Sequence, residues 1–201
     1  MHCHVKTWGA IHQKSVKSTS VNSALYVLYN VLGKRRGEVN AMEKLIITAC
    51  ICGAEVTKEH NPAVPYTVEE IAKEAKSAYD AGASIIHLHV REDDGTPTQS
   101  KERFEACINA IKEVCPDVII QPSTGGAVGM SNEERLAPTT LRPEMATLDC
   151  GTCNFGGDEI FVNTENMIID FANTMNEYGI KPEIEVFDKG MVDMAIRLHK
   201  K

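Results

Sequence analysis

Two histidines separated by one residue are the strongest chemical signal in this sequence. His87 and His89 lie within an otherwise apolar run, residues 85–90, that has the length of a buried strand. Because successive side chains of a strand point to opposite faces, both imidazoles share one face and Leu88 takes the other. Two imidazoles on one face can offer two nitrogens to a zinc ion. The alternative is a pair of hydrogen-bonded core histidines, and the motif alone leaves both interpretations open.

A zinc site that performs chemistry needs a third protein ligand and an open position for water or substrate. Acidic residues stand at the ends of predicted strands, but spacing selects none of them: Glu55, Asp149, Glu183, Glu185 and Asp188. Glu183 and Glu185 share one strand face, and two inward carboxylates are costly to bury unless they meet a cation. They imply a metal, a positively charged substrate group or a basic side chain. A solvated strand end is the alternative for Glu55.

A turn of hydroxyl and glycine residues supplies a second kind of candidate site. Residues 122–126 read Pro-Ser-Thr-Gly-Gly and lie between a predicted strand and a predicted helix. The hydroxyl groups and exposed backbone N–H groups of this turn are suited to hold a carboxylate or another anion. A plain strand-to-helix turn is the alternative.

The candidate residues lie at the ends of strands that alternate with helices. We predict strands at residues 45–50, 84–90, 118–121, 145–149 and 183–187. We predict helices at residues 68–81, 101–114, from 132, 164–177 and 189–198. Thr67 with Glu70, and Ser131 with Glu134, form capping boxes that begin two of these helices. The alternation is typical of an α/β fold with a parallel sheet covered by helices.

The length of each strand and helix unit favours a barrel. Five units in residues 42–201 take about 32 residues each, so eight would need about 256, close to the ~250 of a (β/α)8 TIM barrel. We therefore expect a TIM barrel that is truncated to about its first five β/α units. A five-stranded doubly wound sheet is the rival, but residues 52–55 after the first strand lack its glycine-rich phosphate loop.

Charge and cysteine content narrow the class of protein. Residues 1–41 carry a net charge of +5 and residues 42–201 a net charge of −12, and an acidic body argues against binding to nucleic acid. No apolar run reaches the ~18 residues of a membrane span.

Seven cysteines, an odd number without a secretory signal, favour a reducing cytoplasm. Cys150 and Cys153 have the spacing of a redox or zinc half-site, but no second pair completes a zinc motif. We therefore expect these two cysteines to be small residues at a strand end without a chemical role.

Residues 1–41 show no steady hydrophobic period and are expected to be a disordered N-terminal extension. Met42 precedes two charges and a strand-like run, so we expect it to be the native first residue and residues 42–201 to form the partial barrel. A transit peptide and adventitious metal binding by residues 2–4, His-Cys-His, are the alternatives.

Several segments, taken in order, resemble the β-keto acid cleavage enzymes. The matching residues are 47–55, 65–71, 87–97, 123–126 and 182–188. The resemblance implies a zinc-bound TIM barrel that condenses a β-keto acid with acetyl-CoA and releases acetoacetate and a new acyl-CoA. Such a reaction needs a Lewis acid on the keto oxygen. It further implies an amino-bearing substrate of lysine degradation and a homo-oligomer when the enzyme is full length.

The resemblance also implies roles for individual residues. His87 and His89 resemble the zinc ligands, and Ser123 and Thr147 resemble polar contacts to the substrate. Glu55 and Glu185 resemble the pair that receives a substrate ammonium. The third zinc ligand and the catalytic residues of the family are expected beyond residue 201, so no catalytic residue is assigned. An inactive truncated metal-binding fragment, or a different zinc-dependent barrel lyase or aldolase, is the alternative.

Overall fold

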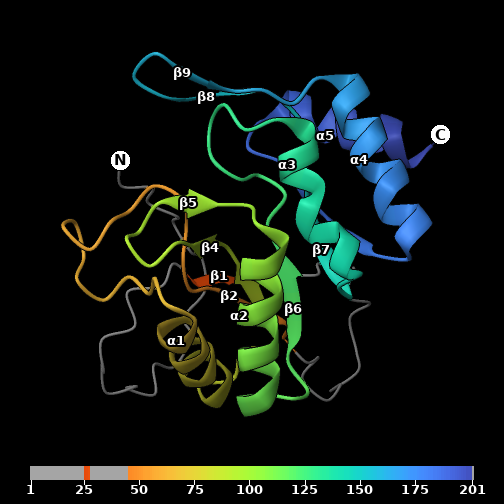
Figure 1. Ribbon diagram of the computed structural model, residues 1–201. Coiled ribbons are helices and arrows are strands. Elements are labelled where there is room, and N and C mark those ends of the chain that lie inside the picture. The colour runs from red at the N-terminus through yellow and green to blue at the C-terminus, as the bar shows by residue number, and fades with distance from the viewer. Residues whose placement is uncertain (1–24, 28–44, 201) are drawn as a thin grey trace, which may run out of the picture.

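The computed structural model describes residues 25–27 and 45–200, and these residues form an α/β fold (Figure 1). Within them, parallel strands follow one another along the chain: β2 (Ile47–Cys50), β3 (Ile85–Leu88), β6 (Ile119–Pro122), β7 (Met145–Asp149) and β10 (Lys181–Glu185). Strands β2, β3 and β6 pair in that order, and β7 pairs with β10. Thr124 joins the two groups, because its N–H donates to Thr147 Oγ1 at 3.0 Å and its hydroxyl donates to Thr147 O at 2.7 Å.

Helices separate the strands, and their bounds agree with the predictions to within one or two residues. They are α1 (Val68–Asp80), α2 (Lys101–Val114), α3 (Asn132–Leu136), the 3-10 helix η1 (Ala137–Leu141), α4 (Glu165–Tyr178) and α5 (Lys189–His199). Both predicted capping boxes are confirmed: Thr67 accepts from Glu70 N, and Ser131 accepts from Glu134 N, with the glutamates reaching back to the cap. These bonds satisfy N–H groups that a helix start leaves without partners.

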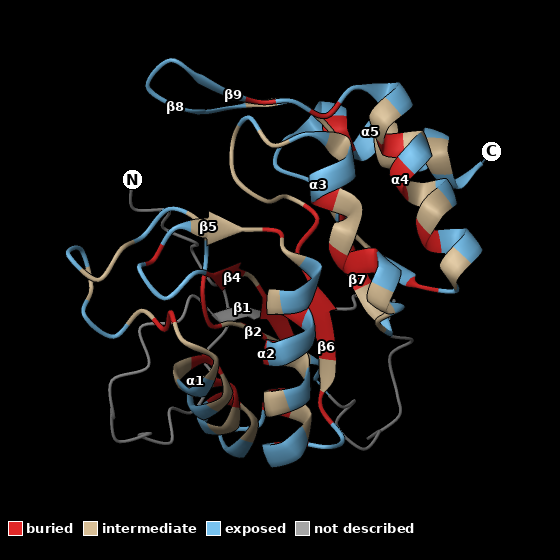
Figure 2. Cartoon of the chain, in the orientation of Figure 1, coloured by how far each residue is buried: buried red, intermediate tan, exposed pale blue. Residues whose placement is uncertain are grey.

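The helices cover one face of the strands, and the core lies between the two (Figure 2). One cluster joins β2, β3 and β6 to α1 and α2, and its fully buried members include Ile71, Ile86, Leu88, Phe104 and Ile111. A second cluster joins β7 and Ile180, the residue before β10, to α4 and α5, and it includes Ala146, Leu148, Ile168, Phe171 and Met175. Alternate residues of β2, β3, β6 and β7 therefore face the core, whereas Ile184 of β10 is exposed, and the other face of the strands is left for polar groups.

Two short pairs of strands extend from this frame. Strands β4 (Val90–Arg91) and β5 (Pro97–Thr98) pair after β3, and β8 (Cys153–Gly156) and β9 (Glu159–Phe161) form a hairpin after β7 that projects at the top of Figure 1. Strand β1 (Leu25–Val27) pairs antiparallel with β2, although the sequence predicted no packed element there. The other predictions for residues 1–41, including the start at Met42, fall outside the described residues.

The predicted strand at residues 145–149 has the same bounds in the structure, the first and third are shifted by one or two residues at an end, and the second and fifth differ more. The second strand is interrupted at His89, between β3 and β4, rather than running through residue 90. The fifth strand is residues 181–185 rather than 183–187. Its partner sets these limits, because Lys181 pairs with Met145 and Glu185 with Asp149, so β10 ends where β7 ends.

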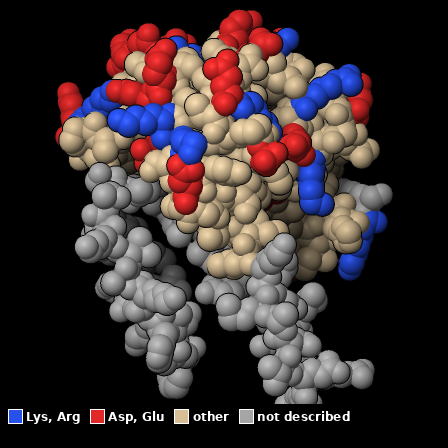
Figure 3. Space-filling model, turned by 90° about the horizontal axis from the view of Figure 1, so that it is seen from below, with Lys and Arg blue, Asp and Glu red and all other residues tan. Residues whose placement is uncertain are grey.

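The surface carries both signs of charge. Acidic and basic side chains are intermingled over the face shown in Figure 3, where the basic groups form no continuous stripe. No helix in residues 45–200 is long and apolar enough to cross a membrane.

Candidate metal and substrate site

The face of the strands that points away from the helices gathers the predicted site residues. Register partners on parallel strands point to the same side, so their side chains lie next to one another. Cys50 on β2 pairs with His87 on β3, and His87 pairs with Gln121 on β6. On the neighbouring sheet, Asp149 on β7 pairs with Glu185 on β10.

The two histidines lie together, as their spacing predicted. The ring centroids of His87 and His89 are 5.0 Å apart, with the ring planes tilted by 60°. His87 Nδ1 is 3.0 Å from Gln121 Oε1, and Gln121 Nε2 donates to Glu183 Oε2 at 2.8 Å. Because the amide nitrogen is engaged by a carboxylate, its oxygen faces the ring, and we assign the proton of His87 to Nδ1. The Nε2 lone pair is then available, an arrangement common in metal-ligating histidines.

The environment keeps both imidazoles neutral. Burial lowers the pKa of His87, although the bond to Gln121 and the charges of Glu183 and Asp149 oppose this shift. Burial, together with His87 and Arg91, lowers the pKa of His89 to about 3. Neutral imidazole is the form that binds a metal ion, so this donor pair fits zinc.

A third metal ligand does not emerge from the described residues. Within residues 25–27 and 45–200, no group of three His, Cys, Asp or Glu side chains gathers as a metal site. Among the candidates, Asp188 instead caps α5 by accepting from Met191 N at 2.9 Å. Cys50 lies near the pair, but burial, followed by Glu185 and Glu183, raises the pKa of its thiol to about 12 and disfavours the thiolate.

Two carboxyl groups meet at the ends of β7 and β10. Asp149 is buried, and its Oδ2 has no hydrogen-bond partner, although Arg135 Nη2 lies 3.7 Å away. Burial and the neighbouring Asp149 and Glu183 raise the pKa of Glu185 to about 9. Glu185 therefore keeps its proton at neutral pH, since ionisation would place a second negative charge beside the first.

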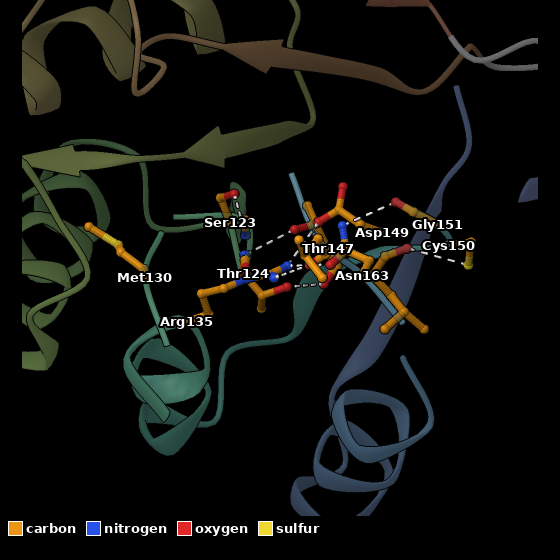
Figure 4. Close-up of polar contacts among 12 residues, drawn as sticks. Ser123, Thr124, Met130, Arg135, Thr147, Asp149, Cys150, Gly151 and Asn163 are labelled. Atoms are coloured by element: carbon orange, nitrogen blue, oxygen red, sulfur yellow. Dashed lines mark hydrogen bonds and ion pairs between the residues drawn. The ribbon is translucent and has the colours of Figure 1, made fainter. Parts of the chain in front are cut away.

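The turn after β6 brings Ser123 and Thr147 to the same region, but it does not form the predicted anion cradle (Figure 4). Ser123 N donates to Leu88 O at 2.9 Å, Thr124 N donates to Thr147 Oγ1, and Gly125 N donates to Ser123 Oγ at 3.1 Å. The prediction was wrong for these three N–H groups, because the fold uses them internally. The hydroxyl oxygens of Ser123 and Thr147 accept the bonds from Gly125 N and Thr124 N, and a hydroxyl that accepts a bond can still donate its own proton.

Arg135 holds this turn in place, and sequence reasoning missed it. Its guanidinium donates to Thr124 O at 2.8 Å, to Val162 O at 3.1 Å and to Asn163 Oδ1 at 2.7 Å (Figure 4). The rings of Phe161 and Phe171 lie 4.7 and 5.0 Å from it. From sequence alone, an arginine in the last turn of a five-residue helix is expected to be exposed to solvent, so no local pattern predicted that Arg135 is buried.

Glu55 and the two cysteines of the CxxC motif differ in position, because Glu55 lies in an exposed loop whereas Cys150 directly follows Asp149 and donates its N–H to Glu185 O. Glu55 is exposed in the loop after β2, and no hydrogen bond or ion pair joins it to Glu185 in the described part of the chain. Burial raises the pKa of Cys150 to about 11 and also raises the pKa of Cys153. Both thiols are free and protonated at neutral pH, which fits the predicted small residues at a strand end rather than a redox pair.

The fold and the histidine pair define a member of a known enzyme class. Residues 44–201 match the family model for the β-keto acid cleavage enzymes, and the chain belongs to this family. Its relatives include the 3-keto-5-aminohexanoate cleavage enzymes of Acetoanaerobium sticklandii and Fusobacterium nucleatum. The chain is 81% identical to the first over 160 residues and to the second over 159, which is 80% and 79% of this chain. It spans 59% and 58% of the length of these two proteins.

More distant relatives extend the comparison. The 3-oxoadipate:acetyl-CoA acetyltransferase of Cupriavidus necator is 40% identical over 155 residues, which cover 77% of this chain and 54% of that protein. Among solved structures, the binary complex of ObcA with oxaloacetate superposes with a TM-score of 0.61 at 24% identity. The match covers 69% of this chain and 34% of ObcA, and it supports the α/β fold.

Proposed function

We propose that the protein carries out the zinc-dependent cleavage of a β-keto acid with acetyl-CoA, giving acetoacetate and a new acyl-CoA. The observation that carries the proposal is the pair of neutral imidazoles in and directly after β3, in a chain 81% identical to two 3-keto-5-aminohexanoate cleavage enzymes over 160 and 159 residues. We propose 3-keto-5-aminohexanoate as the substrate and lysine degradation as the setting. The free cysteines of the described residues are compatible with a reducing, cytoplasmic location.

The architecture supports a barrel as the frame of this chemistry. We propose that β2, β3, β6, β7 and β10 are five consecutive strands of a (β/α)8 barrel, because they follow one another in space in chain order with helices on their outer face. In such barrels catalytic groups stand at the carboxyl ends of the strands. His87, His89 and Asp149 all lie in the last half of a strand or directly after one.

His87 and His89 would hold the zinc ion, with Gln121 and Glu183 orienting the ring of His87. Zinc bound there would supply a Lewis acid for the keto oxygen of the substrate. Ser123 and Thr147 would be polar contacts to the substrate and would donate their hydroxyl protons to it, a role supported by the backbone bonds that their oxygens already accept. Burial of both side chains makes such bonds stronger than they would be in water.

Glu55 and Glu185 are the proposed partners of the substrate ammonium. The raised pKa of Glu185 supports this role, because a cation that enters beside Asp149 and Glu185 would compensate the charge that now keeps the proton on Glu185. A substrate without the amino group offers no such compensation. Selectivity for an amino-bearing β-keto acid follows from this arrangement.

The direct test is the formation of both products. We expect acetoacetate and a new acyl-CoA in equal amounts, measured by mass spectrometry, when the protein receives 3-keto-5-aminohexanoate, acetyl-CoA and zinc. His87→Ala and His89→Ala should each abolish both products, whereas the exposed His199→Ala should not. If neither product forms in conditions under which the Acetoanaerobium sticklandii enzyme forms both, the proposed function is wrong.

A further inference from the structure

Arg91 is a buried cation whose charge is balanced by no carboxylate in the described residues. Its side chain is 1% exposed, yet its hydrogen bonds go to backbone carbonyls. Nε and Nη2 donate to Gly53 O at 2.9 and 2.5 Å, Nη2 donates to Val56 O at 2.9 Å, and Nη1 donates to Gly95 O at 2.9 Å. A buried guanidinium costs free energy unless its donors are well satisfied, and these bonds supply that satisfaction.

The carbonyls that Arg91 binds flank the glutamate proposed to receive the substrate ammonium. Gly53 and Val56 lie on either side of Ala54 and Glu55, so one planar guanidinium grips both ends of this short segment. Gly53 and Glu55 are themselves exposed, which leaves the segment few packing contacts of its own. The position of Glu55 therefore depends on the hydrogen bonds of Arg91.

The surroundings of Arg91 fix it in turn. The ring of Tyr66 lies 5.4 Å from the guanidinium, and the Tyr66 hydroxyl accepts from Lys58 N at 2.6 Å, just beyond the segment. Gly95 presses against the Tyr66 ring so closely that a Cβ there would collide with it. Arg103 Nε donates to Arg91 O at 2.7 Å and holds the backbone. The segment, the ring and the arginine thus form one hydrogen-bonded unit.

We propose that Arg91 is a positioning residue that sets the distance between Glu55 and the histidine pair, and so determines selectivity for substrates with an ammonium at a fixed distance from the keto group. Arg91 lies in β4, two residues after His89, so the hydrogen bonds of Arg91 tie the Glu55 segment to the stretch of chain that carries the histidines. The inference rests on the proposed function, in which Glu55 receives the ammonium and the histidines lie by the keto oxygen.

The first test measures amide hydrogen exchange in Arg91→Lys by mass spectrometry. Lysine keeps the charge but lacks the planar fork that bridges two carbonyls. Exchange at the N–H groups of Thr57 and Lys58, which donate to His60 Nδ1 and to the Tyr66 hydroxyl, should become about tenfold faster or more, while residues 85–88 stay protected. Arg135→Lys is the matched control, since Arg135 is also buried and donates to backbone carbonyls but does not contact this segment. Unchanged exchange at Thr57 and Lys58 in Arg91→Lys would overturn the proposal.

The second test compares 3-keto-5-aminohexanoate with its uncharged analogue 3-ketohexanoate. Arg91→Lys should raise KM on the order of tenfold for the amino-bearing acid alone, with kcat nearly unchanged, because binding is lost and chemistry is not. Glu55→Gln should cause the same loss, and the double variant should lose no more. If Glu55→Gln loses selectivity and Arg91→Lys does not, the inference fails and the proposed function stands. If Glu55→Gln keeps its selectivity, the proposed role of Glu55 fails.

A measurement on the unaltered protein decides the case if Arg91→Lys does not fold. In a nitrogen-15 NMR spectrum the Nε–H of Arg91 should exchange slowly with solvent and show contacts to Gly53, as buried hydrogen bonds to carbonyls require. Rapid exchange of this N–H would overturn the proposal, because the guanidinium would then not hold the segment.

Discussion

Single side chains in this site act through partners that are distant in sequence. Gln121 and Glu183 belong to different strands, yet together they fix the ring of His87. The face shared by the histidines could be predicted, because strand alternation is local. The hydrogen bonds from His87 to Gln121 and from Gln121 to Glu183 could not be predicted, because they depend on which strands become neighbours. The same holds for Asp149, which sequence offered only as one of five carboxylates.

The proton on Glu185 has a consequence for stability. Its pKa rises from 4.5 in the unfolded chain to about 9 in the fold, so between these values the native state binds a proton that the unfolded state releases. Stability contributed by this group is therefore lost as pH rises towards 9. We expect the wild type to lose stability relative to Glu185→Gln as urea unfolding is repeated from pH 5 to pH 9.

Subtracting the free energy of unfolding of Glu185→Gln from that of the wild type at each pH removes the contribution of other titrating groups. The exposed Glu177→Gln should run parallel to the wild type over the same range and serves as the control. A difference between wild type and Glu185→Gln that stays constant with pH would show that Glu185 ionises normally.

Arg135 and Asp149 form a buried ion pair, so the losses in the free energy of unfolding caused by changing each residue alone should not add up to the loss in the double variant. Arg135→Met should cost about 3 to 5 kcal/mol in the free energy of unfolding, because it leaves Asp149 buried without its cation. Adding Asp149→Asn should recover part of that loss. Chemical unfolding of the four proteins measures the coupling, and costs that simply add would contradict the ion pair.

Helix starts were the most predictable elements, because their signals are local. Thr67 and Ser131 each lie three residues before a glutamate, and both capping boxes formed as predicted. The end of β10 was less predictable, because it follows the length of β7 rather than the apolar residues of its own sequence. Val186 and Phe187 extend the apolar pattern but stay exposed beyond the strand.

The cap of α1 can be tested by itself. Thr67→Ala removes the side-chain oxygen that accepts from Glu70 N at 3.2 Å and should lower the free energy of unfolding by about 1 kcal/mol. Thr67→Ser keeps the oxygen and should cost much less. Equal losses in the two variants, measured by urea unfolding, would mean that the methyl group matters more than the cap.

Across the described chain, the strand and helix order defines where chemistry can occur. The residues of β2, β3, β6 and β7 that meet the helices are apolar and buried, so polar side chains converge on the other face at the carboxyl ends of the strands (Figures 1 and 2). This convergence was predictable from the α/β alternation. The sequence could not predict that the backbone N–H groups of residues 123–125 are unavailable to an anion, because only the packed structure shows which of them already donate hydrogen bonds.

The claim that His87 and His89 form a metal centre can be measured directly by zinc titration calorimetry. We expect the unaltered protein to bind zinc, and the variant carrying both His87→Ala and His89→Ala to lose that binding. Gln121→Leu should weaken affinity by roughly 10- to 100-fold, because it removes the partner that orients the His87 ring. His199→Ala should bind as the wild type does. Equal zinc affinity in the wild type and the double alanine variant would contradict the assignment.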